Sequence, residues 1–360
     1  MLFESEASTE LFLRLMALLP SNMSETASLH RISFQLSVII PVYNGSRYLP
    51  RCLAALRQST YQDYELIVVD NGSTDNSVAI AQSFQARILH CPGPSGPGAA
   101  RNMGAQHAAY DVLVFIDADV VIHSDVLSRI ARHFQHDPEL AALFGSYDTN
   151  PGATNLLSQY KNLLHHYVHQ HANEQARTFW AGCGAIRKDL FIAVGMFDTI
   201  AYSRPSIEDI ELGDRLYRGG LRITLDKQLL AQHLKEWRLR SLVHADVWCR
   251  AIPWSQLILT RRGMLNDLNV GQTQRISALA TWLGLGSLFL GLLYPIMLLG
   301  TLLALVLVLS LNQGLFGFFW RLRGPVFTGS VVPIHLLYFL YSSLAFAWVA
   351  GTQLFLSRRS

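Results

Sequence analysis

Apolar residues follow two different periods over the first two-thirds of the chain. Three compact apolar runs have the length and the β-branched content of strands buried on both faces: 36–40, 66–69 and 112–116. The segments that separate these runs carry apolar residues at helical spacing, as at Leu49 and Leu53. Strands that alternate with helices predict an α/β fold with a doubly wound, mostly parallel sheet.

The last third of the chain is far more apolar. Residues 276–311 and 331–356 contain no Asp, Glu, Lys or Arg. A spanning helix needs about 20 residues, so the first run fits two short crossings that turn near Pro295 or Gly300, or one long, tilted or kinked helix. Arginines on both flanks of the first run favour the hairpin with cytoplasmic ends. We therefore expect about three spanning helices at 276–360, with 312–330 as a cytoplasmic connector.

The composition agrees with a membrane protein. Hydrophobic residues make up 50% of the chain and charged residues only 15%, which is too apolar for an ordinary soluble protein. The net charge of +3 gives no reason to expect a nucleic-acid partner. The four scattered cysteines match neither a metal motif nor a disulfide scaffold, so we expect free thiols in a reducing compartment.

Two further segments complete the predicted organisation. Residues 1–35 are expected to be a variable or partly disordered leader, and their early glutamates argue against a secretory signal. Residues 246–275 combine Trp248 and Trp254 with arginines just ahead of the first long apolar run. That pattern suits an amphipathic helix on the cytoplasmic leaflet or, alternatively, a buried amphipathic helix. The remaining segment, 36–245, is the expected catalytic domain.

Candidate chemistry gathers where the predicted strands end. Tyr43, Asp70, Asp117 and Asp119 each follow such a strand, and the carboxyl ends of parallel strands meet at one edge of a sheet, where ligands bind. The spacing of Asp117 and Asp119 lets both carboxylates converge on one hard divalent cation, which in turn can hold nucleotide phosphates. The alternative for these aspartates is a turn whose side chains cap the following helix.

A succession of motifs resembles the family 2 glycosyltransferases, which are inverting enzymes of the GT-A fold. The matching segments, in chain order, are 41–44, 68–75, 100–104, 115–119, 182–187, 195–198 and 208–213. Several motifs in the right order are more specific than any one of them. The resemblance implies a nucleotide-sugar donor such as a UDP- or GDP-sugar, a divalent metal (Mn²⁺ or Mg²⁺) and inversion at the anomeric carbon.

The resemblance also implies roles for single residues. Pro41 and Tyr43 line the nucleoside, Asp70 accepts a hydrogen bond from the base, Arg101 faces the ribose or diphosphate, Asp117 contacts ribose or metal, and Asp119 binds the metal. For Arg101 the alternative is a cation on a helix surface. The Gly- and Pro-rich loop at 91–98 favours the functional interpretation, because its backbone N–H groups can approach anionic oxygens.

Two acidic residues begin a predicted helix near 208–218. Helix dipoles stabilise such residues, which is the structural interpretation of Glu208 and Asp209. In the family, the position of Asp209 is that of the general base, with Glu208 beside it. We expect the helix dipole to keep Asp209 ionised.

The segment 232–237 resembles, imperfectly, the Gln-x-x-Arg-Trp motif of processive relatives. Its Arg is missing, so polymerisation is not expected, and Lys235 and Trp237 are assigned to donor binding. In related galactofuranosyltransferases a His of this region completes the metal site, which favours His233 as third ligand over a buried structural histidine. His165 and His169 are a further possible metal pair, although a solvated or interfacial helix fits them better.

The sequence thus predicts a multi-pass glycosyltransferase of the inner membrane with a cytoplasmic catalytic domain and a lipid or membrane-associated acceptor. A nucleotide-binding scaffold without turnover is the alternative from another class. A sugar-phosphate nucleotidyltransferase would need a Gly-rich phosphate loop with a basic residue, and 41–45 is not one.

Overall fold

The computed structural model describes residues 34–261 and 271–357, which form two compact units. Unit 1 takes in the described residues up to Asn150 together with 173–235. Unit 2 consists of 151–172 and the described residues from Glu236 onward. The predicted leader at 1–35 lies almost wholly outside the described residues, as do residues 262–270 of the predicted interfacial segment.

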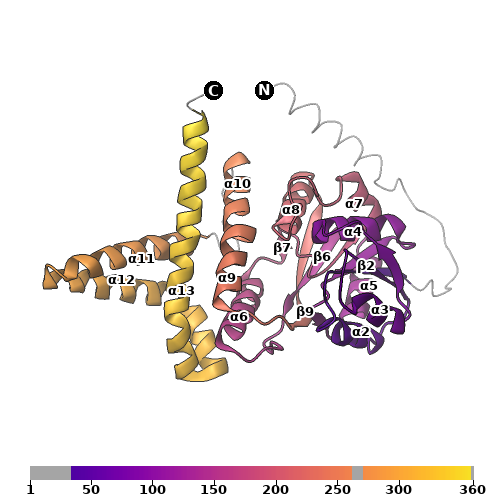
Figure 1. Cartoon of the computed structure of the whole chain (residues 1–360), viewed down its shortest axis with the longest axis horizontal. Helices are drawn as coiled ribbons and strands as arrows, with labels where there is room; N and C mark the ends of the chain where they lie inside the picture. Colours follow the sequence, from indigo (N-terminus) through magenta and orange to yellow (C-terminus); the bar gives the residue numbers. More distant parts are fainter. Residues whose placement is uncertain (1–33, 262–270, 358–360) are drawn as a thin grey trace. The chain divides into compact units, whose positions relative to one another are not determined.

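Unit 1 is built on a nine-stranded sheet with the order β3-β2-β1-β4-β8-β6-β9-β5, in which β7 pairs with β9 (Figure 1). The strands are β1 (Leu36–Val42), β2 (Tyr64–Asp70), β3 (Arg87–His90), β4 (Val112–Ile116), β5 (Val120–Ile122), β6 (Leu140–Tyr147), β7 (Gln175–Ala176), β8 (Cys183–Arg187) and β9 (Arg222–His233). β1 and β4 are buried along their whole length, as their apolar sequences predict.

The sheet is mixed, which corrects the expectation of a mostly parallel one. β1 to β4 pair in parallel, but β8 runs antiparallel to both β4 and β6. The long strand β9 pairs in parallel with β6 and antiparallel with β5 and β7. An apolar run indicates that a strand is buried, but it does not indicate whether the strand runs parallel or antiparallel to its neighbours. The direction of β8 is therefore set by the tertiary structure.

Six helices of unit 1 flank this sheet or connect its strands: α2 (Leu49–Arg57), α3 (Ser77–Ser83), α4 (Gly96–His107), α5 (Val126–His136), α7 (Lys188–Ala193) and α8 (Glu208–Arg218). α4 begins at Gly96, inside the Gly- and Pro-rich loop at 91–98. Pro97 lies in its first turn, where a missing N–H costs nothing and the fixed φ suits a helix. The start of α4 is held at the end of β2, because the Asn71 amide donates to the Gly96 carbonyl.

Unit 2 is helical. Its elements are α6 (Leu156–His171), α9 (Leu239–Asp246), the π-helix η1 (Val247–Ala251), α10 (Ile252–Thr260), α11 (Gln272–Gly291), the 3₁₀-helix η3 (Pro295–Met297), α12 (Leu298–Leu311) and α13 (Gln313–Ser357). α13 is interrupted at Gly324, whose φ of 80° is not helical. α11 and α12 form a helical hairpin within the first apolar run, which turns at Pro295 and not at Gly300, and the predicted connector after it is helical.

Evidence for membrane anchoring from length and composition is slight. Among the described residues, one helix, Gln313–Gln353, is long and apolar enough to cross a membrane, and a shorter apolar helix covers Pro295–Leu311. A core helix of a soluble protein can pass the same test. Multiple crossings therefore stay a prediction.

Candidate active site

The ends of the parallel strands carry the residues expected to bind a nucleoside. Val42 and Asp70 are register partners at the ends of β1 and β2. Asp70 is buried, accepts a hydrogen bond from the backbone N–H of Ser73 (3.0 Å) and lies 3.5 Å from the His90 ring. Pro41 is buried within β1, whereas Tyr43 is 53% exposed beyond it. An exposed aromatic ring next to a buried carboxylate is a suitable arrangement for stacking and pairing a base.

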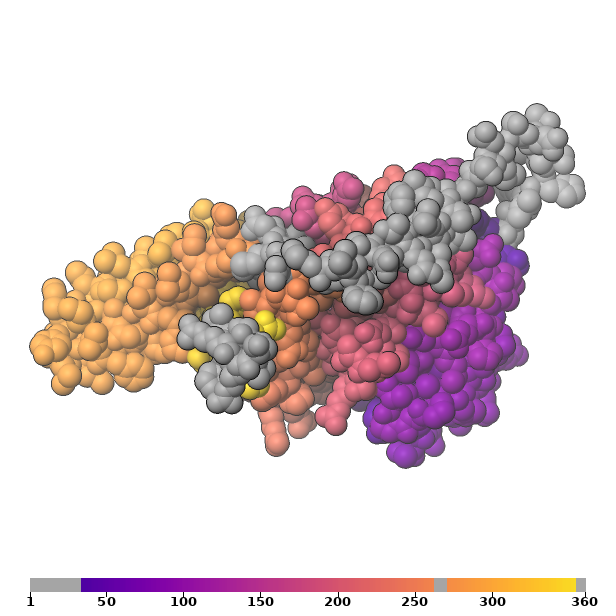
Figure 2. Space-filling model, turned by 90° about the horizontal axis from the view of Figure 1, so that it is seen from above, coloured from indigo at the N-terminus to yellow at the C-terminus, as the bar shows by residue number. Residues whose placement is uncertain are grey.

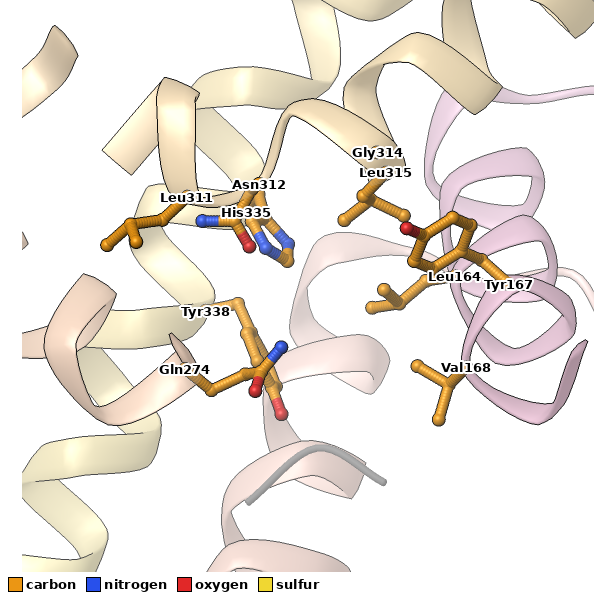
Figure 3. Close-up of a pocket in the computed structure, with 10 residues that line it drawn as sticks. All are labelled: Leu164, Tyr167, Val168, Gln274, Leu311, Asn312, Gly314, Leu315, His335 and Tyr338. Atoms are coloured by element: carbon orange, nitrogen blue, oxygen red, sulfur yellow. The ribbon is translucent and has the colours of Figure 1, made fainter. Parts of the chain in front are cut away.

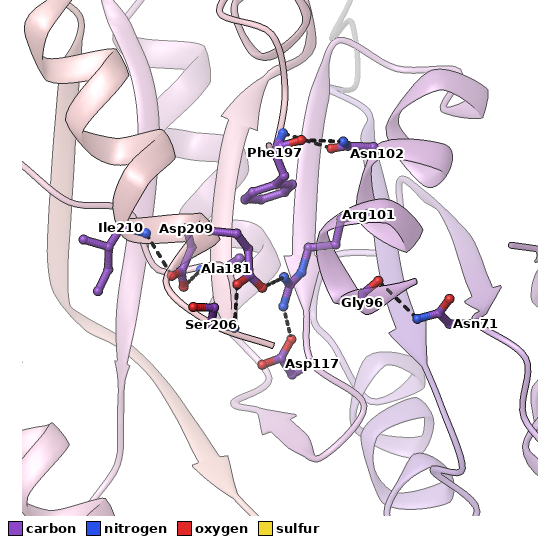
Figure 4. Close-up of polar contacts among 11 residues, drawn as sticks. Asn71, Gly96, Arg101, Asn102, Asp117, Ala181, Phe197, Ser206, Asp209 and Ile210 are labelled. Carbon is purple, nitrogen blue, oxygen red and sulfur yellow. Dashed lines mark hydrogen bonds and ion pairs between the residues drawn. The ribbon is translucent and has the colours of Figure 1, made fainter. Parts of the chain in front are cut away.

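Asn71 holds the Gly- and Pro-rich loop against this edge and was not singled out in the sequence. Its side-chain oxygen accepts hydrogen bonds from the backbone N–H (3.1 Å) and hydroxyl (3.0 Å) of Ser95. Its amide donates to the carbonyl of Gly96 (3.1 Å; Figure 4). A Cβ on Gly93 would lie 2.4 Å from the Asn71 carbonyl oxygen, so the loop tolerates only glycine there. Asn71 lies inside the matching segment 68–75, and this position was the sequence feature that could have pointed to it.

Arg101 connects two separate parts of the site (Figure 4). Its guanidinium, projecting from α4, donates to Asp117 Oδ1 after β4 (2.6 Å) and to Glu208 Oε1 at the start of α8 (3.2 Å). The residue is 4% exposed, so the alternative of a helix-surface cation is wrong. Burial opposes its charge, but the attraction of Asp117 and Glu208 outweighs burial and raises the pKa of Arg101.

Asp209 lies in the first turn of α8, next to Glu208. One carboxylate oxygen accepts a hydrogen bond from the backbone N–H of Ala181 (3.2 Å) and the other from that of Ile210 (2.9 Å; Figure 4). Loss of hydration and the adjacent Glu208 charge raise the pKa of Asp209 to about 7, against the opposing effects of Arg101 and these two N–H groups. The expectation that the helix dipole keeps Asp209 fully ionised at neutral pH is therefore wrong.

A second carboxylate, Asp119, has the opposite electrostatic environment. Burial acts against its ionisation, but His233 and Lys235 attract its charge and lower the pKa of Asp119. His233 Nε2 lies 3.6 Å from Asp119 Oδ2, and its ring stacks on Tyr147 with centroids 4.4 Å apart. The backbone N–H of Leu234 donates to the Asp119 carbonyl (2.8 Å). Pairing between β5 and β9 thus brings the two predicted metal ligands together.

The third predicted ligand is engaged elsewhere, because Asp117 is ion-paired with Arg101. No group of three potential metal-ligating side chains occurs among the described residues. Asp119 and His233 nevertheless form a carboxylate–imidazole pair, which suits Mn²⁺ or Mg²⁺ when phosphate oxygens and water complete the coordination. The residues present fit a metal that arrives with the diphosphate.

Two predicted donor-binding residues differ in their surroundings. Lys235 is exposed and close enough to Asp119 to affect its ionisation. Trp237 falls in unit 2, where its backbone N–H donates to the Ser158 hydroxyl (2.7 Å) and its carbonyl accepts from Asn155 (2.9 Å). These contacts hold it to the start of α6, and its role in donor binding stays a prediction. On the same helix the His165 and His169 rings lie 4.0 Å apart.

Comparisons with known sequences agree with this geometry. Residues 37–195 match the model of glycosyl transferase family 2. The glycosyltransferase GlyG of Streptococcus pneumoniae is 32% identical over 117 residues, which cover 31% of this chain and 38% of the relative. The poly-beta-1,6-N-acetyl-D-glucosamine synthase of Staphylococcus aureus is 23% identical over 234 residues, 61% of this chain and 54% of the relative. The matches thus span about half or less of these relatives.

Two solved structures share the fold. The mannosyltransferase PcManGT from Pyrobaculum calidifontis, in complex with GDP-Man and Mn²⁺, has a TM-score of 0.52 at 14% identity, with 95% of each chain covered. Residues 1–349 of S. aureus TarS, in complex with UDP-GlcNAc, have a TM-score of 0.50 at 18% identity, covering 65% of this chain and 67% of that one. Residues 37–195 thus resemble glycosyl transferase family 2, and the two solved structures share the overall fold of the chain.

Proposed function

We propose that this chain transfers a sugar from a nucleotide-sugar donor to a hydroxyl or phosphate of a lipid or membrane-associated acceptor, with inversion at the anomeric carbon. Asp209 removes the acceptor proton, and Glu208 sets the electrostatic environment of that base. Pro41, Tyr43, Asp70, Arg101, Asp117, Lys235 and Trp237 contribute to donor binding.

The observation that carries the proposal is the position and ionisation of Asp209. A general base works best when its pKa lies near the working pH, and the pKa of Asp209 is raised to about 7. Glu208 is the chain neighbour of Asp209, and Arg101 joins Glu208 to Asp117 at the end of β4. The base and the strand ends therefore belong to one connected site. Arg101 Nε has no hydrogen-bond partner among the described residues, which supports a contact with a donor oxygen.

The donor's diphosphate is assigned to the region of Asp119 and His233. A bound Mn²⁺ or Mg²⁺ would neutralise the charge that accumulates on the departing diphosphate. Asp119 suits a metal ion because its pKa is lowered, which keeps the carboxylate ionised. His233 is held by stacking on Tyr147 and so has little freedom to turn away.

The proposed membrane association is the reason for assigning a lipid or membrane-associated acceptor. The apolar helices of unit 2 and the flanking arginines favour the cytoplasmic face of the inner membrane. A nucleotide-binding scaffold without turnover would need no base, and the raised pKa of Asp209 beside Glu208 favours the enzyme.

The test is transfer of labelled sugar from a panel of UDP- and GDP-sugars into lipid extracts by the whole protein in membranes. Wild type and Asp189→Asn should form the same product, because Asp189 is an exposed acid at the start of another helix, α7. Asp209→Asn should bind the same donor and form far less product. Equal product from the Asp209→Asn variant would refute the proposed reaction.

A further inference from the structure

The α11–α12 hairpin, residues 272–311, exposes apolar side chains around its outer half. Leu292 is 81% exposed, Leu293 75% and Ile296 69%, all at the tip. The sequence contains no Asp, Glu, Lys or Arg between Arg275 and Arg321. The orange surface of the hairpin projects from the rest of unit 2 in Figure 2. An apolar projection without charge is suited to lipid acyl chains rather than to water.

The base of the hairpin is polar and firmly attached to α13. Asn312, at the end of α12, donates to the Ser277 hydroxyl of α11 (2.9 Å) and closes the base, whereas Trp282 Nε1 of α11 donates to Ser343 Oγ of α13 (2.8 Å). A small pocket of about 80 Å³ opens beside this base, and the polar side chains of Gln274, Asn312 and His335 line part of it (Figure 3). Polarity is therefore concentrated at one end of the hairpin, opposite its apolar tip.

α13 has the length to cross a membrane but lies among charges. The Tyr341 hydroxyl, near the middle of its long C-terminal part, donates to Asp246 Oδ2 (2.7 Å). Asp246 is ion-paired with Lys161 of α6 and with Arg250, whose side chain is 45% exposed. In Figure 1 this part of α13 runs alongside α9 and α10 and crosswise to the hairpin. The hairpin and α13 therefore cannot both follow the membrane normal, and the charges disfavour α13.

The length of the hairpin limits how deep it reaches. Ala280 and Val308 pack with Phe339 of α13, so the first turns of α11 are level with α13. From Leu283 to Gly291 the helix extends about 14 Å beyond that level, at about 1.5 Å per residue. Half of a bilayer's hydrocarbon core is about 15 Å thick. With α13 at the surface, the tip ends near the middle of the bilayer.

We propose that the hairpin enters the hydrocarbon of one leaflet and leaves on the same face, and that α13 lies along the membrane surface. The sequence predicted two crossings by the first apolar run and a third by the last one. In the arrangement proposed here, the hairpin enters one leaflet and no helix crosses the membrane. The inference rests on the proposed membrane association of the enzyme and not on its activity, so a failure of the transferase assay leaves its test intact.

The test uses the full chain, reconstituted in phosphatidylcholine vesicles, with single cysteines added to a Cys249→Ser background; the other three cysteines are buried. Spin labels are placed at Tyr294→Cys or Leu293→Cys in the tip and at Val326→Cys and Leu344→Cys on α13, all at exposed positions. The tip labels should be accessible to oxygen and shielded from a water-soluble nickel chelate. The two α13 labels, about 27 Å apart along the helix, should report one shallow depth.

Labelling with a membrane-impermeant maleimide gives the second readout. Tip cysteines should not react from either side of the vesicle, and both α13 cysteines should show access from the same side. A tip cysteine that reacts from the side opposite Val326→Cys would mean that the hairpin crosses. Val326→Cys and Leu344→Cys at opposite faces would mean that α13 crosses. Either result, or loss of the protein from vesicles after a salt wash, overturns the proposal.

Discussion

The region around Asp119 and the region around Asp209 place carboxylates of the same unit in opposite environments. Asp119 has His233 and Lys235 as neighbours, and its pKa is lowered despite burial. Asp209 has Glu208 as its neighbour, and burial together with this like charge raises its pKa to about 7. Two aspartates can thus hold different roles, one staying charged to bind and the other exchanging a proton, because their surroundings differ.

The largest expected effect comes from removing the base. Asp209→Asn keeps the shape and an oxygen that can accept one of the two backbone hydrogen bonds, but it cannot take a proton. Single-turnover transfer should fall by roughly 10²- to 10⁴-fold, the range of a general base, while donor affinity stays near that of wild type. Asp189→Asn is the control. Collapse of donor affinity in the Asp209→Asn variant would move Asp209 from the base role into the donor site.

Arg101 joins Glu208, the neighbour of Asp209, to Asp117, so its loss should affect both the stability of unit 1 and the ionisation of Asp209. Arg101→Met leaves the buried Glu208 charge without its cation, and we expect the free energy of unfolding to fall by about 3–5 kcal/mol, as for other broken buried ion pairs. The pKa of Asp209 should also rise. Chemical denaturation measures the first effect and the pH dependence of transfer the second.

The matched control for that variant is Arg129→Met, which breaks the Arg129–Asp226 pair (2.8 Å) elsewhere in unit 1. It should destabilise unit 1 and leave the pH dependence of transfer unchanged. An equal change of pH dependence in both variants would show that Arg101 acts through stability alone.

Metal removal should affect the Asp119 region only. Calorimetry with UDP and GDP should show nucleoside diphosphate binding that is stronger in Mn²⁺ than in chelator, and His233→Gln should reduce the metal-dependent part by roughly 10- to 100-fold. His123→Gln is the control, because His123 also pairs with an aspartate, Asp148 (3.0 Å), and has no assigned metal role. Equal affinity in chelator and in Mn²⁺ would rule out the metal site.

The smallest effects concern pH. Asp209 must be deprotonated to act, so transfer should rise about tenfold per pH unit below pH 7 and level off above it. Glu208→Gln keeps an acceptor for Arg101 and removes the like charge, so the midpoint should move to lower pH. A midpoint that moves up, or stays in place, would exclude Glu208 as the cause of the raised pKa.

Several features followed from the sequence alone. β4 occupies 112–116 as its unbroken apolar run predicted, and the turn of the hairpin lies at Pro295, one of the two positions that the sequence offered. The strand-end positions of Asp70 and Asp117 also followed, since a strand must end where polar turn residues begin. Local patterns determine such features because burial, helical period and turn chemistry act within a few neighbouring residues.

Tertiary structure alone decided the direction of β8, the association of α6 with unit 2 and the ionisation of Asp209. Arg101 and Glu208 are 107 residues apart in the chain, yet they lie 3.2 Å apart in the site. Asp119 and Asp209 are the same amino acid, each near the start of a local element. Their pKa values diverge because desolvation and Coulomb attraction depend on which distant residues folding brings within a few ångströms.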